Sequence, residues 1–150
     1  MFDRIIVSSD DSYFIQYWKI VTKAWEKFFP EVKINLAFVT NRQENDPFVE
    51  RLKKYGDGIY LFKPVKNIPT RNQGKMARHY LCSQMKNDVC MVEDIDTIPL
   101  QRKYVEYVVN SRIKEKFLKE FSNPQYGFYG KGTHNWGKFA ISYSTAEGYI

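Results

Sequence analysis

The chain has 150 residues, of which 43% are hydrophobic, 17% aromatic and 27% charged. Eleven Tyr, eleven Phe and three Trp residues are too many large rings to leave in water, and eight Gly and six Pro are too few for a low-complexity polymer. This composition excludes a disordered or collagen-like chain and predicts one packed domain over residues 1–150.

Neither a membrane span nor a secretory signal is evident in the sequence. No apolar stretch reaches the roughly 20 residues that a membrane-spanning helix needs, and the N-terminus lacks the apolar core of a signal peptide. We therefore expect no transmembrane segment and a cytoplasmic location. Cys82 and Cys90 form neither a CxxC pair nor a metal-ligand cluster, so we interpret them as small buried hydrophobic residues.

The net charge of +6 is concentrated in one part of the chain. The segment from Gly58 to Asn87 contains no Asp or Glu, but its basic residues are Lys63, Lys66, Arg71, Lys75, Arg78 and Lys86. Such a segment attracts phosphate groups, whether in nucleic acid, an anionic membrane or a small phosphorylated ligand. The alternative is a solvated face that binds nothing in particular.

The first forty residues predict a strand, a helix and a second strand. Residues 4–8 form a short β-branched run, and Ser9–Ser12 is typical of a helix cap. A second strand is expected from Val32 to Thr40. The helix between them is predicted by large apolar residues at steps of three and four, up to Pro30: Phe14, Trp18, Val21, Trp25 and Phe28.

The same alternation continues to residue 92. Asp46–Pro47 marks the start of a second helix, which Gly56–Gly58 ends before a third strand at Ile59–Phe62. A third helix is predicted from about Gln73 to Lys86. Its buried side is expected to carry Ala77, Leu81 and Met85, and Asp88–Val92 follows as the fourth strand.

Strands that alternate with helices predict an α/β fold with a mainly parallel sheet and helices on both faces, because each parallel connection must cross over the sheet. This is a Rossmann-like architecture. Ligands of such sheets collect outside the carboxyl ends of the strands. Residues 8–11 and the residues after Val92 are therefore the places to look for a site.

The last third of the sequence is less regular. Gln101–Phe121 is charged and predicts a helix, and short strands and loops are expected beyond it. The chain stops at Gly148–Ile150 without a polar tail or a closing helix. We take this ending to indicate that the domain is incomplete at its C-terminus.

An acidic cluster, Glu93–Asp96, directly follows the fourth apolar strand. Alternation at a strand end presents Asp94 and Asp96 from the same side, where two carboxylates repel each other. A divalent cation with oxygen ligands removes this conflict and keeps positions open for water and phosphate. The alternative is that both are loop carboxylates capping the turn before Ile98–Leu100.

These features resemble the nucleotide-sugar glycosyltransferases with the GT-A fold. The matching segments are Ile5–Ser9, Asn72–Arg78 and Val89–Pro99, so the resemblance covers about the first hundred residues. It implies that residues 1–100 form the nucleotide-sugar-binding half, with 101–150 as the start of an acceptor-side region. The implied reaction is transfer of a sugar from a nucleoside-diphosphate sugar to an unknown glycan, lipid or small-molecule acceptor.

The resemblance also implies roles for individual residues. Asp94 would contact the donor ribose or reach the metal through water, and Asp96 would ligate Mn²⁺ or Mg²⁺ on the diphosphate. Ser8, Ser9 and Asp11 would lie near the base and ribose. Lys75 and Arg78 would reach the donor or the carboxylates, although surface residues or structural partners of Asp94 are equally good interpretations.

The family commonly supplies a further metal ligand, often a His near the C-terminal end. His134 is the sole candidate late in this sequence, and a lone His among Gly, Asn and Trp is more often a loop residue. Glu147 is the sole acidic residue after Glu120. The catalytic residues, and whether the sugar's configuration is retained or inverted, therefore stay unassigned.

Two other functions compete with this interpretation. Asp94 and Asp96 also resemble the nucleophile and acid/base pair of haloacid-dehalogenase phosphatases, but that family carries its motif early and needs a later acidic pair. A noncatalytic nucleic-acid binder would use the basic segment and the aromatics. We regard nucleic acid as an improbable partner, because Trp18, Trp25 and Phe28 follow core spacing.

Overall fold

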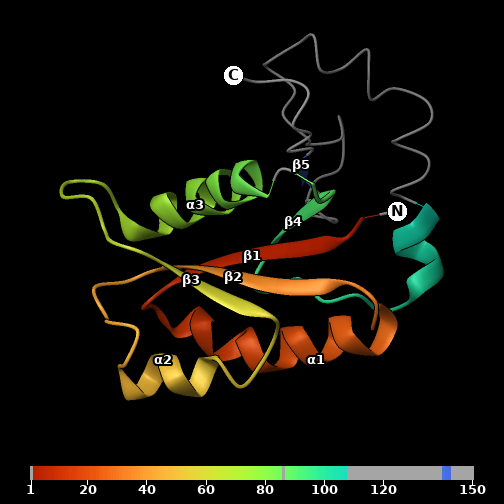
Figure 1. Cartoon of the computed structure of the whole chain (residues 1–150), viewed down its shortest axis with the longest axis horizontal. Helices are drawn as coiled ribbons and strands as arrows, with labels where there is room; N and C mark the ends of the chain where they lie inside the picture. Colours follow the sequence, from red (N-terminus) through yellow and green to blue (C-terminus); the bar gives the residue numbers. More distant parts are fainter. Residues whose placement is uncertain (1, 86, 108–139, 143–150) are drawn as a thin grey trace, which may run out of the picture.

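The computed structural model describes residues 2–85, 87–107 and 140–142, with Tyr13 and residues 140–142 described by their backbone alone. Strands and helices alternate as the sequence predicts (Figure 1). In chain order the elements are β1 (Arg4–Asp10), the 3₁₀ helix η1 (Tyr13–Tyr17), α1 (Trp18–Phe28), β2 (Lys33–Val39), α2 (Pro47–Leu52), β3 (Gly58–Phe62), α3 (Thr70–Gln84), β4 (Cys90–Asp94) and β5 (Ala140–Ser142).

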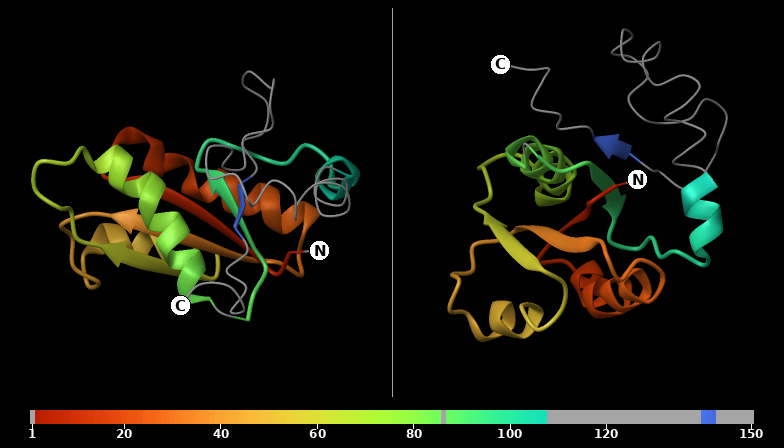
Figure 2. Two further views of the ribbon diagram at one scale, coloured as in Figure 1. Left: turned by 90° about the horizontal axis from the view of Figure 1, so that it is seen from above. Right: turned by 45° about the vertical axis from the view of Figure 1, so that its right-hand side comes forward.

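The strands form one sheet in the order β3-β2-β1-β4-β5. The first four are mutually parallel, and β5 pairs antiparallel with β4. Helix α3 covers one face of the sheet, while α1 and α2 cover the other (Figures 1 and 2). The predicted Rossmann-like α/β fold with a mainly parallel sheet is therefore confirmed.

The strand order creates a topological switch point between β1 and β4. From β1 the chain builds outward through β2 to β3, and it then crosses back over the sheet through α3 to place β4 on the other side of β1. At such a point the connections after the two strands run in opposite directions, which leaves a crevice at their carboxyl ends.

The sheet separates two hydrophobic cores. On the α1 face, Trp18, Val21 and Trp25 are fully buried, as their spacing predicts. Phe28 is half-buried, and the next residue, Phe29, takes the buried position because the chain turns out of helical geometry there. The α3 face packs Ala77 and Leu81 with both cysteines, which are buried as predicted.

Several element boundaries differ from the predictions. Helix α2 begins as expected, with Pro47 in its first turn and the Asp46 carboxylate accepting the Phe48 N–H at 2.7 Å. Ser12 precedes a 3₁₀ turn instead of an α-helix, and its side chain makes no capping hydrogen bond. Helix α3 begins at Thr70, three residues earlier than predicted, because the N–H groups of Asn72 and Gln73 both reach the Pro69 carbonyl.

Strand β4 extends two residues beyond its predicted end at Val92. Its parallel pairing with β1 continues through Val7–Glu93 to Ser8–Asp94, so Glu93 and Asp94 belong to the strand and not to the loop after it. Asp96 lies in the turn that follows, which is closed by a hydrogen bond from the Thr97 N–H to the Asp94 carbonyl at 3.0 Å.

Gly56 makes the turn into β3 possible. Its φ is +68°, and a Cβ there would lie 2.5 Å from the Trp18 ring and 2.8 Å from the Ile34 carbonyl oxygen. The break between α2 and β3 therefore requires glycine for both its backbone conformation and its close approach to the core.

Residues 102–107 are helical, in agreement with the start of the helix predicted from Gln101, and β5 falls within the region where short strands were expected. The rest of that helix, His134 and Glu147 lie outside the described residues. None of the helices in the described ranges has both the length and the apolar character needed to cross a membrane.

Candidate functional site

A cleft of about 230 Å³ opens where β1 and β4 end, beside the first turns of α3. This is the switch point of the sheet, where open α/β folds bind ligands. Of the residues singled out from the sequence, Ser8, Ser9, Lys75, Asp94 and Asp96 all line it. The remaining lining residues are Asp10, Ser12, Phe14, Arg71, Gly74 and Ile95.

The β1 side of the cleft is polar and carries one well-fixed carboxylate. Asp10 accepts hydrogen bonds from the Ser12 N–H at 3.0 Å and from the Thr70 hydroxyl at 2.7 Å. Burial by itself raises the pKa of Asp10, but the hydrogen bonds from Ser12 and Thr70 outweigh it and lower that pKa below its ordinary value. Asp10 is therefore an ionised hydrogen-bond acceptor at the cleft wall.

Asp10 falls within residues 8–11, where the sequence predicts a site, but the sequence pattern gives it no role of its own, although a signal for one exists. Residues two apart in a strand share a face, so Ser8 and Asp10 point the same way as long as the strand reaches residue 10. The predicted strand ended at residue 8, whereas β1 pairs with β2 as far as Asp10–Val39. Because the strand was predicted to end two residues too early, Asp10 was not placed on the same face as Ser8.

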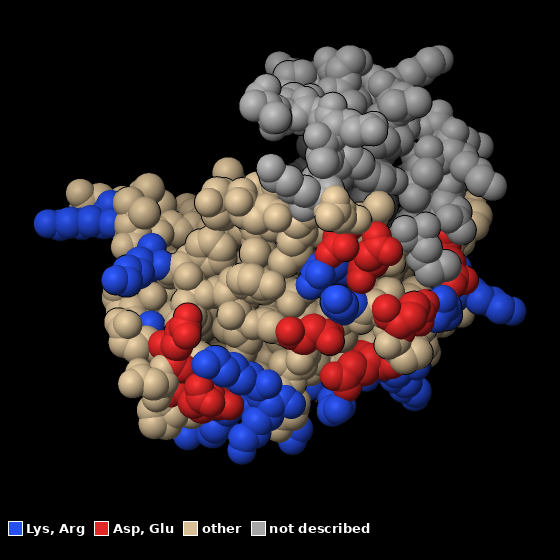
Figure 3. Space-filling view, in the orientation of Figure 1, with Lys and Arg blue, Asp and Glu red and all other residues tan. Residues whose placement is uncertain are grey.

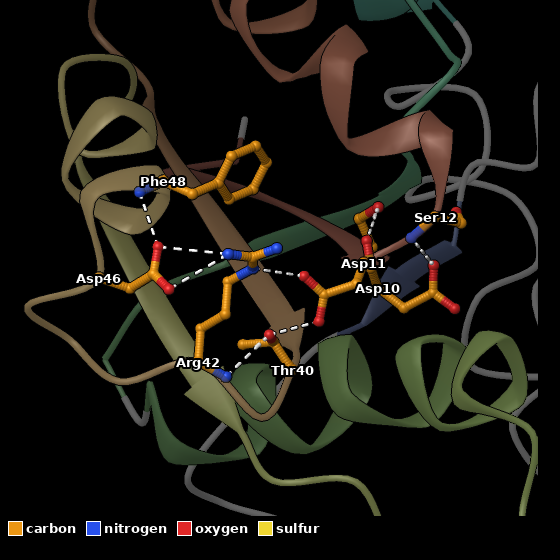
Figure 4. A network of polar contacts seen from close by, with 8 residues as sticks. Asp10, Asp11, Ser12, Thr40, Arg42, Asp46 and Phe48 are labelled. Carbon is orange, nitrogen blue, oxygen red and sulfur yellow. Dashed lines mark hydrogen bonds and ion pairs between the residues drawn. The ribbon is translucent and has the colours of Figure 1, made fainter.

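Asp11 lies outside the cleft lining and points toward β2 (Figure 4). Its carboxylate accepts from the Thr40 hydroxyl at 2.5 Å and from Arg42 Nε at 2.7 Å. The same guanidinium reaches Asp46 at 3.2 Å, which links the end of β1 to the cap of α2. The structure thus gives Asp11 contacts with the scaffold and leaves Asp10 facing the cleft.

The α3 side supplies positive charge. Arg71 and Lys75 are four residues apart, so they lie on the same side of the helix, and both are exposed and line the cleft. Gly74 lies between them and is buried over the end of β1. A Cβ there would be 3.8 Å from the Ser8 hydroxyl oxygen, an ordinary contact distance, so the glycine leaves this part of the cleft open.

The β4 side carries Asp94 and Asp96. Arg78, only 4% exposed, donates to Asp94 Oδ1 at 2.5 Å and to the Glu93 carbonyl at 2.8 Å. Of the roles considered for Arg78, the structure shows a contact with the Asp94 carboxylate, and the guanidinium is not part of the cleft lining. Asp96 is exposed and makes no hydrogen bond or ion pair with any described residue.

Glu93 points to the opposite face of the sheet from Asp94. It is fully buried, and neither carboxylate oxygen has a hydrogen-bond partner within the described part of the chain. Burial raises the pKa of Glu93 well above its ordinary value, and the neighbouring Asp94 charge raises it further. The sequence predicts Glu93 just after the end of the fourth strand, so its position inside β4 is a correction.

Asp94 and Asp96 fit a divalent cation whose remaining coordination positions are filled by the oxygens of a bound ligand. The described residues contain no group of three or more His, Cys, Asp or Glu side chains that could hold a metal ion. Two carboxylates on one cleft are nevertheless the protein contribution typical of Mg²⁺ sites, where water and substrate phosphates supply the other oxygens. The donor set of Asp94 and Asp96 therefore suits a metal–phosphate complex better than a bare metal ion.

No protein-family model matches the sequence, and a search of curated proteins returned no significant match. Any assignment of function therefore depends on the cleft itself.

Proposed function

We propose that this chain is a metal-dependent glycosyltransferase, which transfers a sugar from a nucleoside-diphosphate sugar to an acceptor. The supporting observation is that two cations on α3, Arg71 and Lys75, and two carboxylates on the β4 side, Asp94 and Asp96, line one cleft at the switch point of a Rossmann-like sheet. A diphosphate bound with a divalent cation needs both kinds of group at once. Basic residues alone would fit a phosphate without a metal, and acidic residues alone would fit a cation without a phosphate.

The diphosphate belongs beside α3 in this proposal. Arg71 and Lys75 extend from the first turns of a 15-residue helix, whose N-terminal end carries a partial positive charge. Asp94 and Asp96 would hold Mn²⁺ or Mg²⁺ against the same phosphates. The cation would stabilise the negative charge that develops on the leaving nucleoside diphosphate as the bond to the sugar breaks.

The β1 side of the cleft then receives hydroxyl groups of the donor. Ser8 and Ser12 can donate or accept hydrogen bonds, and the ionised Asp10 accepts them. Sugar and ribose hydroxyls are donors that match such acceptors. Phe14 adds an apolar ring at the same end of the cleft, suited to the flat face of a base.

Arg78 has a positioning role in this scheme. Its bonds to Asp94 and to the Glu93 carbonyl fix the end of β4 against α3. The carboxylate of Asp94 is thereby held in one orientation before any ligand arrives, which reduces the entropy cost of binding.

The experiment is a calorimetric titration with UDP, GDP and their sugar conjugates, each in Mn²⁺ and in EDTA. We expect one nucleotide to bind in Mn²⁺ only, and D96N to abolish that binding. The matched control is E44Q, which neutralises another exposed acidic residue that does not line the cleft. A folded sample that binds none of these nucleotides in Mn²⁺ would contradict the proposal and direct attention to phosphatase assays.

A further inference from the structure

The connection between β3 and α3, residues 63–69, exposes two aliphatic side chains between lysines. Val65 is 59% exposed and Ile68 is 49% exposed, while Lys63 and Lys66 are also on the surface. The loop extends beyond the sheet at the left of the view in Figure 1. Basic side chains project from the same end of the molecule in Figure 3.

This loop is held in shape by one side chain. The Gln73 amide donates to the Val65 carbonyl at 3.0 Å and to the Ile68 carbonyl at 2.6 Å, and it accepts from the Val65 N–H at 2.7 Å. Asn67, between them, takes the left-handed conformation at φ 68°. Because the backbone bonds of Val65 and Ile68 are fixed from the inside, their side chains stay directed away from the core.

The adjoining surface of α3 and β3 is also apolar. Met76 is 69% exposed and Tyr80 is 59% exposed, one helical turn apart, and Tyr60 is 40% exposed on the neighbouring strand. The Tyr80 ring packs edge-on against Phe62 with the ring centroids 6.1 Å apart. From residue 58 to residue 87 the sequence contains no acidic residue that would repel an anionic surface.

We propose that the 63–69 loop and the adjoining Tyr60, Met76 and Tyr80 form a docking surface for anionic lipid membranes. Stable attachment to a membrane takes two signals, such as apolar groups that enter the interface and cations that meet the headgroups, and this loop supplies both in one unit. Tyrosines at the margin suit the headgroup level of a bilayer.

The loop chemistry favours lipid over nucleic acid. Single-stranded nucleic acid binds by stacking its bases on aromatic rings, whereas the residues held outward at the tip of this loop are aliphatic and the tyrosines lie at the margin, where the Tyr80 ring already packs against Phe62. Val65 and Ile68 offer no flat face to a base, but the transfer of their side chains from water to a lipid interface is favourable. The proposal does not depend on the glycosyltransferase function, because membrane binding is measured without any sugar donor.

The test is cosedimentation with vesicles of phosphatidylcholine alone or mixed with phosphatidylserine. We expect the protein to sediment with the mixed vesicles at low salt and to stay in the supernatant with the neutral ones. K63Q/K66Q should lower the partition coefficient about 30-fold, from roughly 1 kcal/mol per lysine. V65S/I68S should lower it about tenfold, because two partly inserted aliphatic side chains are lost.

Matched controls lie outside the docking surface. K33Q/K54Q removes the same charge from exposed lysines outside the docking surface, and I20S removes an aliphatic side chain that is 56% exposed on α1. Both should sediment like the wild type, and circular dichroism should show every variant folded. The proposal is overturned if the wild type does not sediment with phosphatidylserine vesicles, or if the loop variants and the controls have the same partition coefficient. Loss of binding to a single-stranded oligonucleotide in K63Q/K66Q, without any vesicle binding by the wild type, would also overturn it.

Discussion

Arg78 and Asp94 form an ion pair that joins the middle of α3 to the last residue of β4. The guanidinium is almost fully buried, and the Asp94 side chain is 28% exposed at the cleft. The same nitrogen of Arg78 also donates to the Glu93 carbonyl, so one cation satisfies both a carboxylate and a main-chain oxygen. Asp94 therefore belongs to the scaffold as well as to the cleft, whereas Asp96 has no such contact within the described residues.

This difference predicts that Asp94 and Asp96 have separable effects on stability. D94N removes the charge that compensates a buried guanidinium, which should lower the free energy of unfolding by about 1.5–3 kcal/mol, less than for a fully buried pair because the Asp94 side chain is 28% exposed. D96N changes an exposed side chain and should stay within about 0.5 kcal/mol of the wild type. Urea denaturation of the two variants measures both values. Equal losses would contradict the structural role of Asp94.

Gly74→Ala is expected to increase stability while it weakens ligand binding. Replacing a helical glycine by alanine stabilises a helix by about 0.5–1 kcal/mol, and the new methyl group would meet Ser8 at an ordinary distance of 3.8 Å. The same methyl group would occupy part of the cleft beside Ser8. Thermal unfolding and nucleotide titration of one preparation test both effects.

N72A is the control for this variant. Asn72 is exposed in the first turn of α3 and does not line the cleft, so alanine there should improve helix stability without changing nucleotide affinity. If G74A binds nucleotide as tightly as N72A does, the ligand does not approach the helix backbone at Gly74.

Glu93→Gln should flatten the dependence of stability on pH. The pKa of Glu93 in the folded protein is raised well above its ordinary value of 4.5. The buried site favours the protonated form of Glu93. The contribution of Glu93 to the free energy of unfolding is therefore complete below about pH 4.5 and is lost as the pH rises through the raised pKa. Above that pKa, each pH unit costs about 1.4 kcal/mol for this one proton.

Urea denaturation across the pH range checks this expectation. Glutamine keeps the size of the side chain and cannot ionise, so E93Q should be more stable than the wild type at alkaline pH and similar to it under acidic conditions. If the free energy of unfolding changes with pH in the same way for the wild type and for E93Q, Glu93 is not the group that sets the pH dependence of stability.

The alternation of strands and helices was predictable because it depends on local patterns. The stripe of Trp18, Val21 and Trp25 and the Asp46–Pro47 cap each act over a few residues. The position of the cleft was predictable as well, because parallel strands bring Ser8 and Asp94 to one edge of the sheet regardless of the details between them.

What could not be predicted depends on pairing between distant segments. The end of β4 is set by its register with β1, which no local pattern around Val92 reveals. For the same reason Glu93 looked like a loop residue, since a charged side chain in a buried strand position contradicts the usual preference. A contact between Arg78 and Asp94 was one of several roles considered from the sequence, but the choice among them depends on the separation of α3 and β4, which only the folded sheet defines.

The neighbours Asp10 and Asp11 are predicted to differ in function although their side chains are chemically identical. Successive residues here point in different directions, so Asp10 faces the cleft and Asp11 contacts Thr40 and Arg42 (Figure 4). D10N removes a charged acceptor from the cleft and should weaken binding of a nucleoside-diphosphate sugar about tenfold, the effect of one charge-assisted hydrogen bond. D11N leaves the cleft unchanged and should reduce stability by at most about 1 kcal/mol, because its ion pair with Arg42 is largely exposed. Nucleotide titration and urea denaturation of both variants test this prediction. If D11N lowers nucleotide affinity more than D10N does, the donor lies along the end of β2 instead of between β1 and β4.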